Sequence, residues 1–276
     1  KMGGFNFATK SEKLETGGSV NFNYKDADIQ SKTNSETFVS SETSSFKNAL
    51  TANRNKTTNL TADFRIEWKP DTLTTLLVRP RLTYGKTDNS SGSKSYTFNA
   101  DPEIDTDELI NSDDLTSLVP EEKIVNTIIQ NSLSKGDDIT AGGSLMFNRR
   151  LGKAGRNINF RGSYNYTNSE SEQFSISETE YFQKSEEERM EILNRYITTP
   201  TKSYNYSLRF TYSEPIFKGG FLQFSYNFQY NKSKTDNSTY DMPNDWEIAD
   251  GYLPDVAVFN PDLSKTAEYD YYNHQA

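Results

Sequence analysis

Cysteine is absent from this chain of 276 residues, and His274 is its single histidine. The first absence excludes disulfide bonds and thiolate metal sites, although it leaves the compartment open. Any Ser-His-Asp triad or histidine-rich metal site would have to be built around His274, two residues from the last residue. We therefore expect neither kind of site.

Long apolar runs are also missing: no stretch approaches the ~18 residues of a membrane-spanning helix. Only 33% of the residues are hydrophobic, and the mean hydropathy is -0.83. Disordered chains share this low apolar content, but they lack aromatic residues. Because this chain has 17 Tyr and 17 Phe, we expect an ordered protein whose aromatic side chains gather on one face.

An excess of basic residues is the third absence. The formal net charge is -9, which argues against a nucleic-acid partner bound through a basic surface.

Apolar and polar residues alternate strictly in NLTADFRIEW, residues 59–68. Leu60, Phe64 and Trp68 fall on one side, whereas Asp63 and Arg65 fall on the other. This period of two over about ten residues is typical of a half-buried strand. Six further stretches alternate in the same way: 14–24, 75–84, 139–150, 158–166, 204–212 and 221–230.

Short and long connections also alternate along the chain. Short joints lie at 10–13, 70–72, 152–155 and 215–220, and polar excursions span about 26–50, 87–137, 171–201 and 237–266. This rhythm predicts an up-and-down antiparallel sheet with all short turns at one end. Within the excursions, residues 120–133 and 185–197 resemble helices; the second begins with Ser185 and Glu188 in capping-box spacing.

The joint at Pro70 also predicts a register. Pairing Lys69 with Leu73 keeps the apolar residues of both strands on one face. Asp63 would then lie opposite Arg79, with Arg81 on the diagonal, so that these charges neutralise one another.

Three features favour lipid, rather than a second sheet, as the partner of the apolar face. Arginines lie in the middle of the polar stripes; the apolar stripes end in Tyr or Trp, which prefer the headgroup level; and the stretches have the length of tilted membrane strands. A backbone in lipid must pair every N–H and C=O, which requires a closed barrel. A soluble β-sandwich remains the alternative, because Tyr and Phe are enriched in ordinary strands.

Three segments resemble hairpins of the outer-membrane β-barrel family found among TonB-dependent receptors of Bacteroidetes-type bacteria. They are FRIEWKPDTLTTLLVRPRLTYGKTDN, NRRLGKAGRNINFRGSYNY and YSEPIFKGGFLQFSYNFQYNKSKTD, and their order also fits. The resemblance implies a barrel of 22 strands, a plug domain and energy coupling through TonB. We count about nine strands and identify neither a plug nor a TonB-contacting segment. Residues 1–276 are therefore expected to be a partial barrel domain, an internal fragment of a longer receptor.

The resemblance implies active uptake of a nutrient such as a glycan, peptide or metal chelate across the outer membrane of a Gram-negative cell. The expected partners are membrane lipid, the TonB complex through the plug region, and a surface lipoprotein. Two alternatives stay open: a passive porin or secretion barrel, and a soluble β-rich surface or adhesion protein.

The charged residues of the polar stripes are the candidate lumen-facing site. They pair with one another or with a plug, or they contact substrate; we favour the pairing. The candidates are Asp63, Arg65, Glu67, Arg79, Arg81, Arg161 and Arg209.

No residue pattern predicts an enzyme or a cofactor. Glu187 and Glu188 are adjacent but fall in the expected solvated helix. Asp101, Glu103, Asp105 and Asp107 have the spacing with which calcium loops present oxygen ligands, yet Thr106 stands where an EF-hand needs Gly. We favour a solvated acidic loop over a calcium site.

Overall fold

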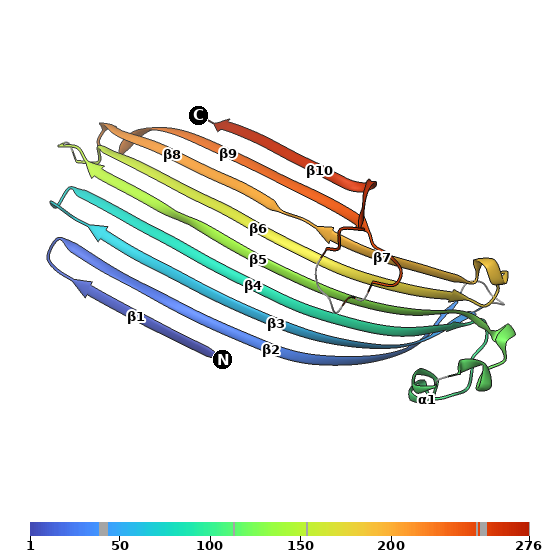
Figure 1. Ribbon diagram of the computed structural model, residues 1–276. Coiled ribbons are helices and arrows are strands. Elements are labelled where there is room, and N and C mark those ends of the chain that lie inside the picture. The colour runs from blue at the N-terminus through green and yellow to red at the C-terminus, as the bar shows by residue number, and fades with distance from the viewer. Residues whose placement is uncertain (39–43, 113, 153, 247, 249–252, 276) are drawn as a thin grey trace.

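The computed structural model describes residues 1–38, 44–112, 114–152, 154–246, 248 and 253–275. One antiparallel sheet of ten strands makes up nearly all of this part (Figure 1). Its strands are β1 (Met2–Lys10), β2 (Leu14–Phe38), β3 (Ser44–Trp68), β4 (Thr74–Phe98), β5 (Ile124–Arg150), β6 (Asn157–Tyr181), β7 (Met190–Thr198), β8 (Thr201–Phe217), β9 (Gly220–Asp241) and β10 (Val258–Gln275). The all-β, antiparallel, up-and-down fold predicted from the alternation is confirmed.

The strands follow one another across the sheet in chain order, except at β7 and β8. Both strands pair with β6 and with β9, and they keep one register against each neighbour. β7 and β8 therefore occupy one strand position between β6 and β9. The strand is interrupted at Thr199 and Pro200, where proline has no N–H to donate. This interruption reconciles the expected count of about nine with the ten strands observed.

The strands are much longer than the alternating stretches, so the predicted long excursions are wrong in extent. β2, β3, β4 and β6 each have 25 residues. Most of 26–50, 87–137 and 171–201 is paired strand, and the chain between β4 and β5 is confined to 99–123. Alternation fades there because both faces of the sheet carry polar residues, although the backbone pairing continues.

The two predicted helices are wrong. Residues 120–133 form the 3₁₀ turn Glu121–Lys123 and the start of β5, and residues 185–197 form the 3₁₀ turn Glu186–Glu188 and most of β7. Pairing with a neighbouring strand overrides the local helical pattern at both places. The described helices are the α-helix α1 (Thr106–Asn111) and the 3₁₀ turns Leu115–Ser117, Glu121–Lys123 and Glu186–Glu188. In the described residues, no helix has the length and apolarity to cross a membrane.

The turn at Pro70 has five residues, 69–73, and the predicted pairing of Lys69 with Leu73 is wrong. Trp68 pairs with Leu76 instead. The carboxylate of Asp71 accepts hydrogen bonds from the backbone N–H of Leu73 (2.8 Å) and the hydroxyl of Thr74 (3.2 Å). These bonds organise a wider turn, and the backbone N–H of Leu73 contributes most to holding the pKa of Asp71 below its usual range. The shift is two residues, so the predicted faces are preserved.

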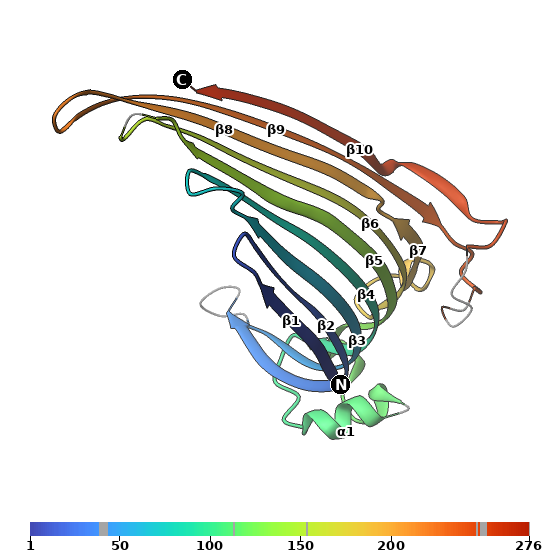
Figure 2. The ribbon, with the colours of Figure 1, turned by 90° about the vertical axis from the view of Figure 1, so that its left-hand side faces the viewer.

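The sheet is strongly curved, and its two outermost strands are β1 and β10 (Figure 2). Well-buried apolar side chains form two small clusters beyond the alternating stretches, near the ends of the long strands. The first joins α1 and its loop to β4 and β5: Tyr96, Phe98, Leu109, Ile110, Leu115, Val119 and Ile124. The second joins β6 and β7 to the chain after β9: Phe174, Tyr196, Met242 and Trp246.

Candidate functional site

The apolar face of the alternating stretches is open rather than covered by protein. The side chains of Leu60, Phe64 and Phe224 are 37%, 38% and 57% exposed. A single line of paired residues that crosses seven strands near the short-turn end is apolar throughout: Leu14, Trp68, Leu76, Phe147, Phe160, Phe210 and Tyr226. We name this face, between the aromatic ends of the stripes, the apolar band.

Tyrosines mark the border of the apolar band that faces the long strand ends. Their hydroxyl groups donate hydrogen bonds to carboxylates that lie just beyond the band: Tyr24 to Asp26 (3.4 Å), Tyr84 to Asp137 (3.0 Å) and Tyr230 to Asp270 (3.1 Å). This placement, with an apolar ring on one side and a polar group on the other, suits a boundary between apolar and aqueous surroundings.

The opposite border, near the short turns, repeats the arrangement. The hydroxyl of Tyr212 donates to Glu214 (2.5 Å), and the guanidinium of Arg156 binds both oxygens of that carboxylate at 2.7 Å. Tyrosine–carboxylate contacts therefore occur at both edges of the apolar band, three of them toward the long strand ends and one, on β8, near the short turns.

The apolar band crosses the strands obliquely. At the border that faces the long strand ends, the line of paired residues that starts at Tyr230 on β9 runs toward Gly18 on β2. Gly18 is six residues from Tyr24, which marks the border on β2. The line passes through Tyr206, Tyr164, Gly143 and Pro80. On the other border, the line from Leu14 reaches Tyr226, four residues from Leu222, where the stripe of β9 begins. From β2 to β9, six strand spacings or about 29 Å, each border shifts by about 13–20 Å along the strands. The band therefore makes an angle of roughly 25–35° with the lines of paired residues.

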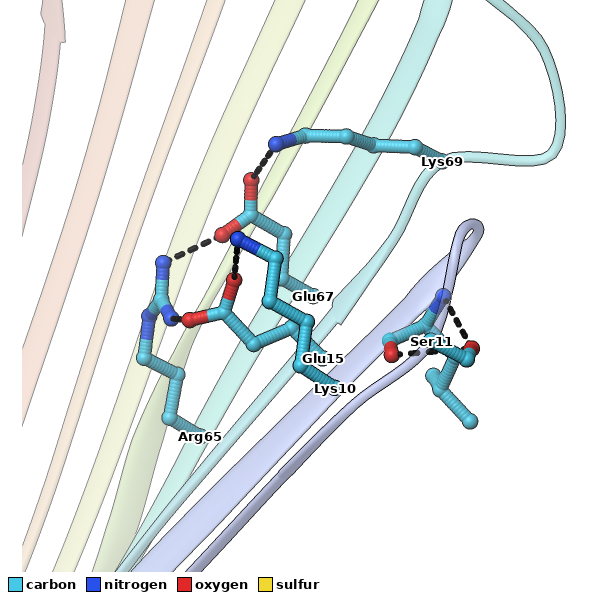
Figure 3. A network of polar contacts seen from close by, with 7 residues as sticks. Lys10, Ser11, Glu15, Arg65, Glu67 and Lys69 are labelled. Atoms are coloured by element: carbon cyan, nitrogen blue, oxygen red, sulfur yellow. Dashed lines mark hydrogen bonds and ion pairs between the residues drawn. The ribbon is translucent and has the colours of Figure 1, made fainter.

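All seven predicted site residues lie on the opposite, polar face. One group of them forms a network at the short-turn end (Figure 3). Glu15 and Glu67 lie directly opposite each other on β2 and β3, and Arg65 bridges them, with 2.6 Å between its Nη1 and Glu15 Oε1. Lys69 Nζ lies 2.6 Å from Glu67 Oε1, and Lys10 Nζ lies 3.7 Å from Glu15 Oε2. The like charges of the two glutamates are thus neutralised within the wall.

Asp63 pairs with Arg81 rather than with Arg79. The two residues are direct cross-strand partners, and Arg81 Nε lies 3.4 Å from Asp63 Oδ1. The predicted pairing of Asp63 with Arg79 is wrong by the same two residues as the register of the turn.

The remaining arginines, Arg79, Arg161 and Arg209, form a second group. All three side chains are exposed, and none lies within ion-pair distance of a carboxylate in the described part of the chain. The structure therefore separates the candidates into a paired group on β2–β4 and an arginine cluster on β4, β6 and β8.

Glycines deepen the polar face between these groups. A hollow of about 640 Å³ is lined by Asp63, Arg65, Arg79 and Arg81, together with Gly142 and Gly143. A Cβ added to Gly142 would lie 2.6 Å from the carbonyl oxygen of Tyr164, so backbone closeness requires glycine there. The hollow presents paired and unpaired charge together.

The acidic loop candidates are used locally. Asp105 caps α1 by accepting a hydrogen bond from the N–H of Asp107, Asp101 accepts one from the N–H of Glu103, and Asp107 pairs with Lys32. In the described residues, no three carboxylate or imidazole groups are arranged to hold a metal ion.

Two features escaped the sequence reasoning. The first is a row of adjacent tyrosines on four strands, Tyr164, Tyr206, Tyr230 and Tyr272, with ring centroids 4.7–5.8 Å apart. The separate stripes contained these residues, but only the register aligns them.

The second missed feature is the cluster around Phe174. The Phe174 ring lies 4.6 Å from that of Tyr196 and 5.4 Å from that of Trp246, between centroids. Burial, together with Glu172 nearby, raises the pKa of Tyr196 to about 12. The residues come from stretches interpreted as loop or helix, so the sequence carried no signal for the cluster.

Comparison with known proteins yields no matching family model, no matching curated protein and no matching solved structure.

Proposed function

We propose that this chain is part of the wall of an outer-membrane β-barrel, with the apolar band in lipid and the polar face toward a watery lumen. The oblique apolar band carries the proposal. Strands of membrane barrels are tilted by about 35–45°, so a slab of lipid crosses the lines of paired residues obliquely. The band slants in this way, and its angle of roughly 25–35° meets the lower end of that range. Stripes of 9–11 residues at such a tilt span about 21–30 Å, a range that includes the ~25 Å height of the lipid-facing band.

A soluble sandwich fits this geometry less well. Its apolar face packs against a second sheet, whereas the described chain offers no layer over the band. The tyrosine–carboxylate borders are also the arrangement expected of aromatic girdles at two membrane–water interfaces.

Within this class, we propose a TonB-dependent receptor that imports a nutrient such as a glycan, peptide or metal chelate. The support is the resemblance of three segments, which correspond to the hairpins β3–β4, β5–β6 and β8–β9. In this proposal the sheet forms the wall, the ends of the long strands face the outside, and displacement of a plug by the TonB complex opens the path. A surface lipoprotein would cover the outer ends.

Cysteine labelling tests the facing directly, because the chain has no cysteine of its own. The full chain, reconstituted in phospholipid vesicles, would carry Phe224→Cys or its neighbour Ser225→Cys. We expect a charged maleimide to label Ser225→Cys and to spare Phe224→Cys until the vesicles are dissolved in SDS. The same contrast is expected between Leu208→Cys and Ser207→Cys. Equal labelling of each pair in intact vesicles would refute the membrane wall.

Conductance separates the receptor from a passive porin. In a planar bilayer, the complete natural protein would give steady ion currents if it were an open pore. A receptor whose lumen is filled by a plug is expected to stay closed. Steady currents would contradict the receptor while leaving the barrel intact.

A further inference from the structure

The polar face has two halves that treat their charges differently. On β2 and β3, each of the acids Glu15, Asp63 and Glu67 has a basic partner. From β5 to β9, the polar-face side chains opposite the apolar band are hydroxyl and amide groups, Gly142, Met146 and arginines, with no carboxylate among them. Within this half, Arg161 and Arg209 therefore have no carboxylate beside them to neutralise their charge.

Two members of the cluster face each other. Arg161 and Arg209 are direct cross-strand partners on β6 and β8. Side chains in this relation start about 4.5–5.5 Å apart, and like charges so placed repel. The same wall holds the opposite case, in which Arg65 bridges the directly opposed Glu15 and Glu67. In the described part of the chain, no carboxylate bridges Arg161 and Arg209 in the corresponding way.

Arg79, the third member of the cluster, lines the same hollow as Arg161 and Arg209. Arg79 pairs with Ser144, Ser144 with Ser163, and Ser163 with Ser207, so a row of small hydroxyl side chains runs between Arg79 and the other two arginines. Arg161 and Arg209 each lie two residues from this row. A hollow of about 460 Å³ occupies the space, lined by Arg79, Ser144, Met146, Arg161, Ser207 and Arg209.

We propose that the arginine cluster binds a small soluble ligand that bears carboxylate or phosphate groups. The planar guanidinium fork binds both kinds of oxyanion with two parallel hydrogen bonds, and hydroxyl groups of the serine row add further donors. An anion between Arg161 and Arg209 would relieve their repulsion as Arg65 relieves that of the two glutamates. The inference deepens the proposed transport function by giving the ligand's charge class, and it rests on that function only for the role of the polar face as a passage.

The test uses the full chain in detergent micelles at low ionic strength, with citrate as the carboxylate probe and inorganic pyrophosphate as the phosphate probe. We expect at least one probe to bind in calorimetric titration and to raise the thermal unfolding midpoint. Arg209→Gln should weaken that binding at least tenfold, and Arg209→Lys, which keeps the charge but loses the fork, should weaken it severalfold. The matched control Arg54→Gln removes one charge from the other face and should change the affinity less than twofold.

A second readout separates a ligand site from a structural role. Without added anion, Arg209→Gln should unfold at the same temperature as the wild type or higher, because repulsion is removed. The proposal would be overturned if neither probe bound at about 10 mM, a concentration that reveals even weak anion sites. It would also be overturned if Arg209→Gln and Arg54→Gln weakened binding equally. Because micelle binding does not require the apolar band to face a bilayer, this failure is distinguishable from a failure of the cysteine-labelling test.

Discussion

The same long strands behave differently in their two halves. In the half next to the short turns, Leu14–Tyr24 of β2 carries apolar residues on one face and polar residues on the other. Beyond the tyrosine border, residues 25–38 of the same strand are mostly polar on both faces, with Ala27, Ile29 and Phe38 as the exceptions, yet they pair with β3 without interruption. Alternation thus reports a difference between the surroundings of the two faces, whereas pairing of the backbone does not require such a difference.

Packing also differs between the halves. The two buried clusters lie beyond the apolar band, where the protein covers its own apolar side chains. Side chains of the band, such as Phe64 and Phe224, are exposed instead. Four changes test this contrast.

Phe174→Ala should have the largest effect. The side chain is 1% exposed between Tyr196 and Trp246, and its removal leaves a cavity, so we expect a loss of about 3–5 kcal/mol in the free energy of unfolding. Denaturant unfolding in micelles measures it. The control Phe224→Ala, in the band and 57% exposed, should cost much less; equal losses would contradict the division into a covered and an open half.

Phe64→Arg should follow. In the apolar band the charge would meet lipid, which costs about 2–4 kcal/mol near the bilayer midplane. Insertion into vesicles, measured by the yield of protease-resistant chain, should fall accordingly. Thr61→Arg on the polar face and Ala52→Arg beyond the border on the same strand should insert as well as the wild type. Impaired insertion of Ala52→Arg would show that the band extends past its tyrosines.

Alkaline pH should weaken the second cluster. Burial raises the pKa of Tyr196 from 10.0 to about 12, so between these values the unfolded chain releases a proton that the folded chain retains. Stability from this residue is therefore complete below pH 10 and is lost as the pH rises toward 12. Unfolding midpoints measured from pH 9 to 12 should fall less steeply in Tyr196→Phe; identical slopes would exclude this residue as the cause.

Arg54→Gln should have the smallest effect. Arg54 pairs with Asp26 at 3.0 Å just beyond the border, where both groups are open to solvent and salt screens them. We expect an unchanged thermal midpoint within error. A clear decrease would indicate that this half of the sheet depends on its surface charges.

Much of the wall was predictable from particular residues. Seven alternating stretches located seven strands, and the even spacing of Leu60, Phe64 and Trp68 assigned their faces correctly. The turn at Pro70 was placed two residues off because the hydrogen bonds of Asp71 are a local choice among turns that all preserve the faces. The helical reading of 185–197 failed because its apolar residues find partners on β6 that no local pattern reveals.

The candidate site divides in the same way. That Arg65, Arg79, Arg161 and Arg209 share one face follows from residue parity within each strand and from the match of stripes between strands. Which of them are paired does not follow, because pairing depends on which positions the register sets opposite one another.

The sequence alone determined the antiparallel β class, the two unlike faces and the approximate positions of the short turns, since each depends on local spacing. Only the tertiary structure decided the full length of the strands, the slant of the apolar band and the cross-strand pairing of Arg161 with Arg209. These properties depend on the relative shift of residues distant in the chain, and that shift is set by the sum of cross-strand contacts rather than by any single segment.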